Sequence, residues 1–445
     1  MPIGKPNSAA KPQRVTDAAP SFAEANRTWA RIALLSFGGP AAQIALMHRV
    51  LVDEKGWIDE QRFLHALNFC TLLPGPEAQQ LATYIGCLFH GVRGGLVAGL
   101  LFILPGIVAI MALSWLYVLT GNVGAVAGML FGLKAAVLAI VLHALQRIAA
   151  RAFKSKWQRV LALAAFMLLF FVAAPLPLVV LGAGLVGWWM TRGVRADSVT
   201  LSAQVGWKRT LNLALPWFTI WLIPVCGLVF VLGPDHVFSQ IATFFSTAAM
   251  VTFGGAYAVL AYVGQQAVEH YGWLKPGEML DGLGLAETTP GPLIMVLQFV
   301  GFLAAYRDPG MLNPLVAGTI GGLIATFVTF APCFLWIFAG APHVERLRGN
   351  VRLSGALAGI TAAVVGVIAS LALWFAVHAL FARVSRVDQG PFDFDWPVLA
   401  SINPWAALLA VAAAVAIFRF KLGIAPTILA AAAAGFALSA AELVA

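Results

Sequence analysis

Long apolar stretches separated by short basic turns constrain this chain more than any other feature. From about Thr28 to the C-terminus, runs of about twenty apolar residues follow one another with little between them. A helix needs about 20 such residues to cross roughly 30 Å of hydrocarbon. Hydrophobic residues make up 60% of the 445 residues and charged residues 11%, whereas a soluble protein carries about 25% charged residues. We therefore expect an all-α polytopic membrane protein with the lipid bilayer as its solvent.

The apolar stretches divide into thirteen expected crossings, six in each half of the chain and one connector between the halves. The expected crossings are 28–52, 63–90 (broken), 95–119, 123–148, 160–172, 175–190, the connector 211–232, and then 237–268, 279–305 (broken), 315–338, 353–381, 397–418 and 422–443. The expected domains are a disordered cytoplasmic tail at 1–26, a first repeat at 27–195, a connector at 196–235 and a second repeat at 236–445. The tail lacks the apolar core of a secretory signal.

Basic residues give these crossings an orientation. The net charge of +9 comes largely from clusters between apolar runs, at 147–159, 192–209, 346–352 and 419–421. With thirteen crossings, all four clusters lie on the same side as the N-terminus, and cytoplasmic loops carry an excess of Lys and Arg. We expect an inner (plasma) membrane protein with a cytoplasmic N-terminus and a periplasmic C-terminus, and no nucleic-acid partner. A re-entrant hairpin in place of one crossing would change this parity.

The chain contains an internal repeat. The motifs Phe37-Gly38-Gly39, Gly56-Trp57 and Pro74-Gly75-Pro76 recur 216 residues later as Phe253-Gly254-Gly255, Gly272-Trp273 and Pro290-Gly291-Pro292. Further along, Pro105 and Gly132 match Pro332 and Gly359 at an offset of 227. Because an odd connector separates the copies, the second is expected to be inverted. Inverted repeats with broken helices are typical of secondary transporters, although some channels share them.

Glycine and proline interrupt the apolar runs at equivalent places in the two repeats. In lipid such breaks survive where protein or a water-filled cavity covers the freed backbone groups. A restarted half-helix directs free N–H groups and a positive dipole end at the gap, which favours an anion. Simple packing kinks are the alternative explanation. The candidate substrate-binding residues at the breaks are Phe37, Gly38, Gly39, Pro40, Pro74, Gly75, Pro76, Phe253, Gly254, Gly255, Pro290, Gly291 and Pro292.

Three of the ionisable residues inside the apolar stretches are candidates for a role in transport. Lys134 lies about eleven residues into its stretch, where an intramembrane charge is usually functional, so it is a further candidate for attracting the substrate anion. Snorkelling to the interface is the alternative for Lys134. Glu77 follows the first Pro-Gly-Pro and Glu287 precedes the second. Because a buried carboxylate can take up a proton near neutral pH, both are candidates for proton coupling, with capping of a helix terminus as the alternative.

Polar residues at the ends of the first broken helix are vestibule candidates: His65, His90 and Arg93. Arg93 is equally well explained by the excess of basic residues on the cytoplasmic side. The four cysteines have no CxxC spacing, so we expect no metal site. No nucleotide-binding loop and no catalytic motif occurs, so we expect no cofactor, no ATP-driven step and no enzyme activity.

The motifs together resemble the chromate ion transporter family. Phe37-Gly38-Gly39-Pro40, Gly56-Trp57, Leu73-Pro74-Gly75-Pro76-Glu77 and Leu104-Pro105-Gly106 carry the resemblance, and 252–255 and 289–292 look like its repeat. The similarity runs from about Thr28 to the C-terminus and has the long-chain, two-domain form. It implies bacterial efflux of chromate, a tetrahedral dianion, powered by an ion gradient. Ala256 stands where the first repeat has Pro40, so the two breaks need not be equivalent.

We therefore expect a secondary active transporter that exports chromate by alternating access, driven by an ion gradient, with protons as the expected coupling ion. One alternative is a transporter or exchanger of sulfate or another oxyanion, because chromate and sulfate share charge and shape. A gated anion channel is the other alternative. The expected partners are the oxyanion and the bilayer, and a homodimer is left open.

Overall fold

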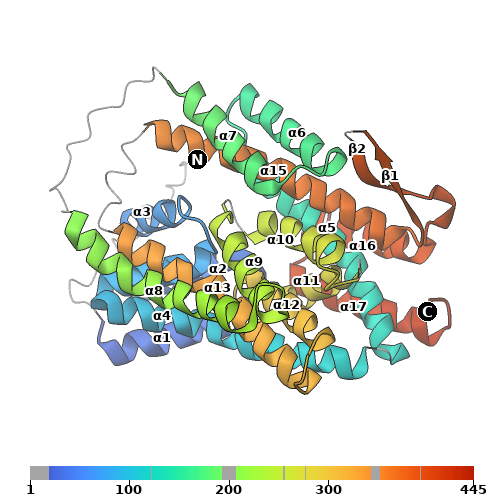
Figure 1. The fold of residues 1–445 in the computed structure, drawn as a ribbon, viewed down its shortest axis with the longest axis horizontal. Coiled ribbons are helices and arrows are strands. Elements are labelled where there is room, and N and C mark those ends of the chain that lie inside the picture. The colour runs from blue at the N-terminus through green and yellow to red at the C-terminus, as the bar shows by residue number, and fades with distance from the viewer. Residues whose placement is uncertain are drawn as a thin grey trace, which may run out of the picture.

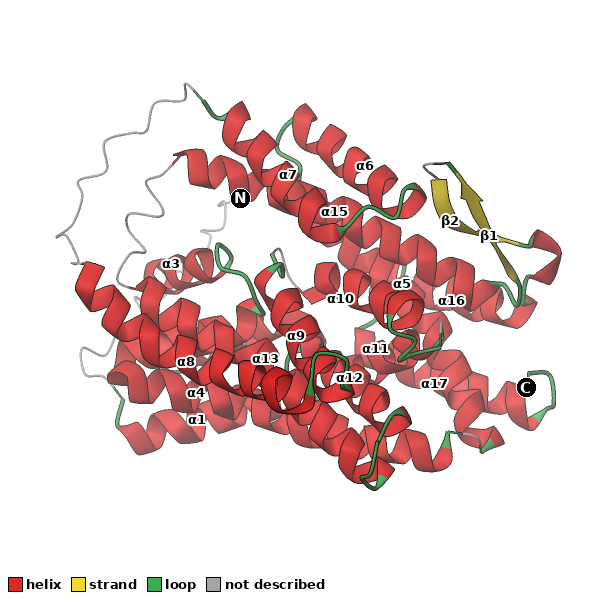
Figure 2. Ribbon diagram, viewed as in Figure 1, coloured by secondary structure: helices red, strands yellow, loops and turns green. Residues whose placement is uncertain are grey.

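The computed structural model describes residues 20–121, 123–192, 207–253, 256–275, 277–341, 351–390 and 392–444. The expected all-α class is confirmed, as Figures 1 and 2 show. The first part contains α1 (Phe22–Leu34), α2 (Gly39–His48), η1 (Arg49–Glu54), α3 (Glu60–Cys70), α4 (Glu77–Thr120), α5 (Gly124–Ala152), α6 (Lys156–Phe171), α7 (Leu176–Met190) and α8 (Trp207–Leu232). α1 begins inside the expected tail, because Ser21 accepts a hydrogen bond from the backbone N–H of Glu24 and so caps the helix. Residues 1–19 of that tail lie outside the described ranges.

The second part repeats the same order of elements. It contains α9 (Val237–Met250), α10 (Ala256–Gln265), η2 (Gln266–His270), α11 (Glu278–Thr288), η3 (Leu293–Met295), α12 (Val296–Arg307), α13 (Pro314–Gly340), α15 (Val351–Leu380), η5 (Leu399–Ser401), α16 (Pro404–Phe418) and α17 (Ile424–Ala440). A β-hairpin that the sequence did not predict, β1 (Val384–Gln389) with β2 (Phe392–Pro397), lies between α15 and α16. Of the described helices, α4, α5, α8, α13 and α15 are long and apolar enough to cross a membrane.

The local geometry of the two repeats agrees at the 216-residue offset. Both η1 and η2 are π-helical segments that follow a short α-helix. Gly56 and Gly272 have φ of 60° and 64°, and Gly75 and Gly291 have φ of 124° and 106°. Such positive values strain a residue with a side chain but not glycine, so the conformation explains why glycine stands at both copies.

The first broken segment of each repeat folds back on itself. In the first repeat, Lys55 Nζ lies 3.0 Å from Glu24 Oε1, and Arg31 Nη1 lies 3.3 Å from Glu54 Oε2. The Lys55–Glu24 pair joins the end of η1 to the first turn of α1, so α1 and α2–η1 run antiparallel, and Arg31 from the last turn of α1 reaches the same end of η1. In the second repeat the rings of Phe244 and Tyr262 join α9 to α10 at 5.5 Å.

The second broken segment of each repeat is also a hairpin. The Trp57 ring, just before α3, lies 5.8 Å from that of Phe89 in α4. In the second repeat, Arg307 at the end of α12 pairs at 2.6 Å with Glu278 at the start of α11. In each repeat the chain therefore runs inward along α3 or α11, turns at Pro-Gly-Pro and runs back along α4 or α12.

α4 reverses direction within its length. His90 and Gly91 leave helical geometry, with Gly91 at φ 58° and ψ −152°. A Cβ at Gly86 would lie 2.5 Å from the carbonyl oxygen of Gly94, so the two arms pack closely side by side. Residues 77–90 therefore belong to the re-entrant hairpin, and residues 91–120 form the separate helix expected at 95–119.

These hairpins change the path expected at four of the thirteen segments. The segments expected as crossings at 28–52, 63–90, 237–268 and 279–305 each return toward the end where they began. Among the described residues, nine of the thirteen segments show no such return: the second arm of α4, α5, α6, α7, α8, α13, α15, α16 and α17. Because the number of crossings removed is even, the expected parity of the termini and of the basic turns is unchanged.

The helices group into two bodies, which can be followed in Figure 1. The hairpin body comprises α1–α4 and α8–α13, and the bundle body comprises α5–α7, α15–α17 and the β-hairpin. Within the bundle body the repeats exchange partners: a Cβ at Gly132 of α5 would meet the carbonyl oxygen of Ala431 in α17. Its copy Gly359 of α15 meets Ala183 in α7 in the same way. Such small-residue contacts let helix backbones approach closely, and the two bodies meet chiefly where α5 contacts α11 and α10 contacts α15.

Candidate functional site

The tips of the four hairpins meet through two equivalent backbone hydrogen bonds. The N–H of Gly291 donates to the carbonyl of Ser36 at 2.9 Å, and the N–H of Gly75 donates to the carbonyl of Thr252 at 2.7 Å. Ser36 corresponds to Thr252 and Gly75 to Gly291 at the 216-residue offset. The two bonds are therefore copies of each other, and each joins one repeat to the other. Reciprocal contacts of this kind are the mark of a two-fold relation.

The Pro-Gly-Pro turns lie against the opposite repeat. A Cβ at Gly291 would lie 3.0 Å from Cα of Gly106 in α4, and a Cβ at Gly75 would lie 2.9 Å from Sγ of Cys333 in α13. Gly106 and Cys333 are related by the 227-residue offset. The side-chain amide of Gln43 also donates to the carbonyl of Gly291 at 2.6 Å. The breaks are thus covered by protein on this side, as the lipid environment requires.

A cavity of about 410 Å³ opens beside the tips, between the two bodies. We call it the break cavity. From the hairpin body it is lined by Gly38, Gly39, Pro40, Ala41, Ile44, Thr71, Leu72, Glu77, Ala256 and Tyr257. From the bundle body it is lined by Ile140, His143, Ala144, Arg147, Ile148 and Arg151 of α5, by Ser354, Leu357, Ala358 and Thr361 of α15, and by Ile424 of α17. Its size lies in the usual range of small-molecule sites.

Two arginines give the break cavity its positive charge. Arg147 and Arg151 lie one turn apart on α5, with His143 one turn earlier, so all three occupy the same helix face. Neither guanidinium forms an ion pair with a residue that the structure describes. The sequence reasoning assigned both arginines to a cytoplasmic turn, because the expected crossing ended at 148. The four-residue spacing of His143, Arg147 and Arg151 places the three side chains on one face of a continuous helix, and this spacing could have indicated a shared site.

The first turn of α2 also faces the break cavity. Gly38 has left-handed backbone geometry (φ 81°), and no side chain caps the helix. The first N–H groups of a helix have no partner within it, and Gly39, Pro40 and Ala41 line the cavity. A helix N-terminus with free N–H groups attracts anions. Gly38, Gly39 and Pro40 therefore line the cavity, and their role in binding the substrate stays a prediction.

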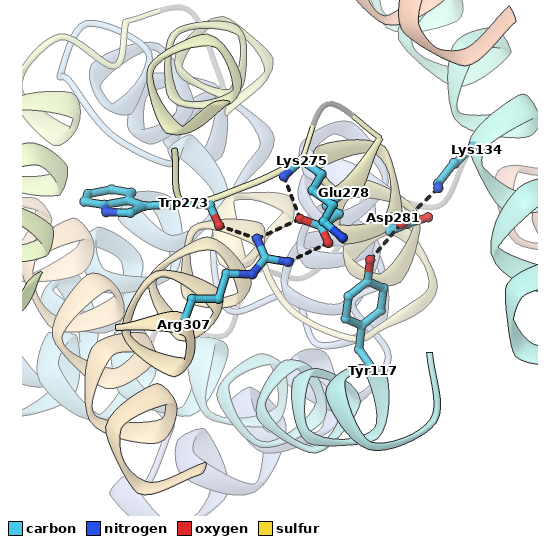
Figure 3. Close-up of polar contacts among 7 residues, drawn as sticks. All are labelled: Tyr117, Lys134, Trp273, Lys275, Glu278, Asp281 and Arg307. Atoms are coloured by element: carbon cyan, nitrogen blue, oxygen red, sulfur yellow. Dashed lines mark hydrogen bonds and ion pairs between the residues drawn. The ribbon is translucent and has the colours of Figure 1, made fainter. Parts of the chain in front are cut away.

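Lys134 does not line the break cavity. Its Nζ pairs at 3.2 Å with Oδ2 of Asp281 in α11, and the hydroxyl of Tyr117 donates to the same oxygen at 3.0 Å (Figure 3). Asp281 was not a candidate in the sequence, because its partners come from α4 and α5, more than 140 residues away. The charge of Lys134 is therefore paired with that of Asp281, and its ammonium group does not lie at the helix breaks.

The two coupling candidates have different surroundings. Glu77 lines the break cavity at the first turn of α4. Glu287 is buried with 2% exposure, and its Oε1 accepts a hydrogen bond of 2.5 Å from the hydroxyl of Tyr257. Oε2 of Glu287 has no partner among the described residues. Because Tyr257 lines the break cavity, its hydroxyl connects Glu287 to that space.

The remaining candidates lie apart from the break cavity. Phe37 is 42% exposed and is not a lining residue. Residues 74–76 and 290–292 hold the tips together without lining the cavity, and Phe253 is half-buried next to them. Gly254 and Gly255 lie outside the described residues. His65 and Arg93 are exposed, and the His90 ring packs 5.4 Å from that of Phe22, so none of the three is part of the break cavity.

A second cavity of about 480 Å³ lies further along the same interface. We call it the far cavity; its lining includes Ala261 and Glu269 of α10–η2, Val367 of α15, the α6–α7 turn and Arg386 of the β-hairpin. On α10 the two cavities are separated by the step from Tyr257 to Ala261, and on α15 by the step from Thr361 to Val367. At 1.5 Å per residue, these steps are about 6 Å and 9 Å.

Comparison with known proteins identifies the family. The profile of the chromate transporter family matches residues 23–188 and residues 239–436, which are most of the two repeats. This chain belongs to the chromate transporter family. It is a polytopic membrane protein of a family that transports chromate.

Relatives named as chromate transport proteins match most of the chain. A chromate transport protein from Pseudomonas aeruginosa is 34% identical over 80% of this chain and 83% of its own length. A probable chromate transport protein from Synechococcus elongatus is 28% identical over 86% of this chain and 90% of its own. A chromate transport protein from Cupriavidus metallidurans is 28% identical over 79% of this chain and 81% of its own length. No solved structure matches this chain.

Proposed function

We propose that this protein exports chromate from the cytoplasm by alternating access, with the break cavity as the cytoplasmic binding site and a proton gradient as the driving force. The observation that carries this proposal is the meeting of the α2 N-terminus with Arg147 and Arg151 in one cavity between two bodies. Preorganised N–H groups and guanidinium groups are the donors that bind tetrahedral oxyanions.

The basic turns support the proposed orientation. The lining residues of α5 run from Ile140 to Arg151, so the cavity extends about 16 Å from the tips toward the end of that helix. Lys154, Lys156 and Arg159 follow directly in the turn to α6. An excess of basic residues favours the cytoplasmic side, so the break cavity opens to the cytoplasm and the far cavity to the periplasm.

A short movement would change the side to which the site opens. The barrier between the cavities is about one to two helical turns on α10 and on α15. Shifts of about one turn of one packed element past another are known in switching proteins. Sliding the hairpin body along the bundle body by this amount would carry the tips from the break cavity to the far cavity.

Proton coupling is assigned to groups that face or adjoin the cavity. Glu77 lines it directly, and Glu287 reaches it through the hydroxyl of Tyr257. A carboxylate without a full set of partners in an apolar environment is more stable when it is neutral. Proton uptake at these residues in exchange for the bound dianion would couple the two movements.

Two other functions are retained as alternatives. Sulfate or another tetrahedral oxyanion would fit the same donors, so the cavity does not by itself select chromate. A gated anion channel would need a continuous path, whereas the two cavities are separate.

The deciding experiment uses the purified protein in proteoliposomes with an imposed pH gradient and labelled chromate. The proposal requires saturable accumulation against the chromate gradient, its collapse on addition of a protonophore, and weaker competition by sulfate than by unlabelled chromate. Stronger competition by sulfate would support the other-oxyanion alternative. Flux that does not saturate and never exceeds equilibrium would support the channel and refute the transporter.

A further inference from the structure

One ion pair connects the two bodies. Of the ion pairs whose two residues the structure describes, Lys134–Asp281 is the one that joins the bundle body to the hairpin body. The Glu278–Arg307 pair, one turn away on α11, lies wholly within the hairpin body (Figure 3). The two pairs therefore offer a comparison between a contact that must change when the bodies slide and one that need not.

The bodies are in close contact at this ion pair. A Cβ at Gly284 of α11 would lie 1.6 Å from Cδ2 of Leu133 in α5, which leaves room for glycine alone. Leu133 precedes Lys134, and Gly284 lies one turn from Asp281 on α11. The two bodies are thus in direct contact here, whereas nearer the other end of α5 the break cavity separates them.

The closed contact lies toward the periplasmic side in the proposed orientation. Tyr117, the third partner, stands one turn before the end of α4 at Thr120. Asp281 lies in the first turn of α11, near the open end of its hairpin. The closed contact and the opening to the cytoplasm are therefore on opposite sides of the tips.

Asp281 has an incomplete set of partners. Its side chain is 2% exposed, and its Oδ2 forms the ion pair with Lys134 and accepts the hydrogen bond from Tyr117. Oδ1 is buried with no partner among the described residues. The other charged groups near it are Glu278 on the same helix and Arg307 on α12, which neutralise each other. The Lys134 side chain is 31% exposed, so it can remain charged when its partner is neutral.

We propose that Asp281 is a further binding site for the coupling proton, on the periplasmic side of Glu77 and Glu287, and that its ion pair with Lys134 locks the periplasmic side of the interface. A proton from the periplasm binds the Asp281 carboxylate, which becomes a neutral carboxyl group. Lys134 keeps its own proton, the electrostatic attraction across the interface is lost, and the hairpin body is free to slide. Release of the proton on the cytoplasmic side restores the carboxylate and the lock. Lys134 is then a residue of the gate and not a ligand of the substrate.

This inference rests on the proposed transport function, and its test separates the two. Asp281→Asn mimics the neutral carboxyl and cannot bind the proton. In proteoliposomes, the variant is expected to exchange internal for external chromate at a rate within about threefold of the unsubstituted protein. A pH gradient should no longer drive accumulation above equilibrium, and the dependence of the exchange rate on periplasmic pH should be lost. If the unsubstituted protein itself shows no chromate flux, the transport proposal fails, and this inference, which rests on it, fails as well.

A matched control removes the other ion pair. Glu278→Gln breaks a buried pair on the same helix but leaves the interface intact, so its accumulation should still follow the pH gradient. The charge exchange Lys134→Asp with Asp281→Lys restores the lock and should lower the exchange rate relative to Asp281→Asn. Gradient-driven accumulation by Asp281→Asn would overturn the proposal. So would a folded Asp281→Asn variant that exchanges no chromate, because a released lock must permit movement.

Discussion

Gly291 is the residue whose replacement tests the joined tips most directly. In Gly291→Ala the new Cβ would lie 3.0 Å from Cα and 3.2 Å from N of Gly106. Both are backbone atoms of α4, so neither can rotate away. The alanine would also have to adopt a φ of 106°, which residues with a side chain rarely do.

The two effects can be estimated separately. A non-glycine residue in an unfavourable φ/ψ region costs about 1–3 kcal/mol, and overpacking of a close contact typically costs about 1–3 kcal/mol. We therefore expect Gly291→Ala to destabilise the protein by about 2–6 kcal/mol and to abolish transport, since the bond to Ser36 would open. The thermal midpoint in detergent, followed by size-exclusion fluorescence, measures the stability, and chromate flux in vesicles measures the function.

Two further alanine variants separate strain from crowding. Gly39 has a φ of 78° but no atom within 4 Å of its added Cβ, so Gly39→Ala should show the conformational cost alone. Gly182 in α7 is helical with nothing within 4 Å, and alanine there should be neutral or stabilising by up to about 1 kcal/mol. A Gly291→Ala protein as stable and active as Gly182→Ala would refute the close approach of the repeats.

Three further outcomes are expected. Arg147→Gln should raise the KM for chromate about 10- to 150-fold, because hydrogen bonds to charged groups are worth about 1.5–3 kcal/mol. Initial uptake rates as a function of chromate concentration measure this KM. The control Arg192→Gln removes an arginine that stacks on Trp188 outside the break cavity, and it should leave the KM unchanged. Tyr257→Phe should lower the thermal midpoint because Glu287 loses its hydrogen-bond donor, at a cost of about 1–3 kcal/mol. The double variant Tyr257→Phe with Glu287→Leu should recover part of this loss. A Tyr257→Phe protein as stable as the unsubstituted protein would contradict the assigned hydrogen bond. Hydrogen bonds from Arg386 lower the pKa of Asp393. The pair therefore stabilises the β-hairpin above about pH 4, the ordinary aspartate pKa, and this stabilisation is lost as the pH falls further. Amide hydrogen exchange of residues 384–397 should then accelerate, and an unchanged exchange rate in the acid range would show that the pair does not stabilise the hairpin.

The breaks and the register of the repeat could be predicted from the sequence because glycine and proline act locally. Gly75 and Gly291 need positive φ at equivalent turns, and Pro76 and Pro292 remove a backbone donor in both copies. These requirements are visible in the residue types themselves. The repeat offset therefore predicts equivalent breaks in the two copies.

The re-entrant path could not be predicted in the same way. An apolar run has the same composition whether its second half continues across the bilayer or turns back. The charges within the first stretch were an indication, because Arg31 pairs with Glu54 and both would lie within or close to a continuous crossing. Such pairs form where the two arms lie side by side, which is a tertiary property.

The candidate site was predicted at its backbone but not at its charges. The α2 N-terminus lines the break cavity, and its role in binding stays a prediction, whereas Lys134 does not line the cavity. Lys134 finds Asp281 across an interface between bodies that no local pattern describes. Arg147 and Arg151 reach the cavity because α5 continues to Ala152, four residues beyond the expected end.

The reciprocal bonds between the tips have a consequence for biosynthesis. The N–H of Gly75 and the carbonyl of Ser36 find their partners on residues 252 and 291. At about 5–20 residues per second, the ribosome needs roughly 10–40 s to make the 216 residues that separate equivalent positions. During that interval the first pair of hairpins is already made but cannot complete its tips, so the nascent chain must wait in the membrane, sheltered from proteolysis, until its second half arrives.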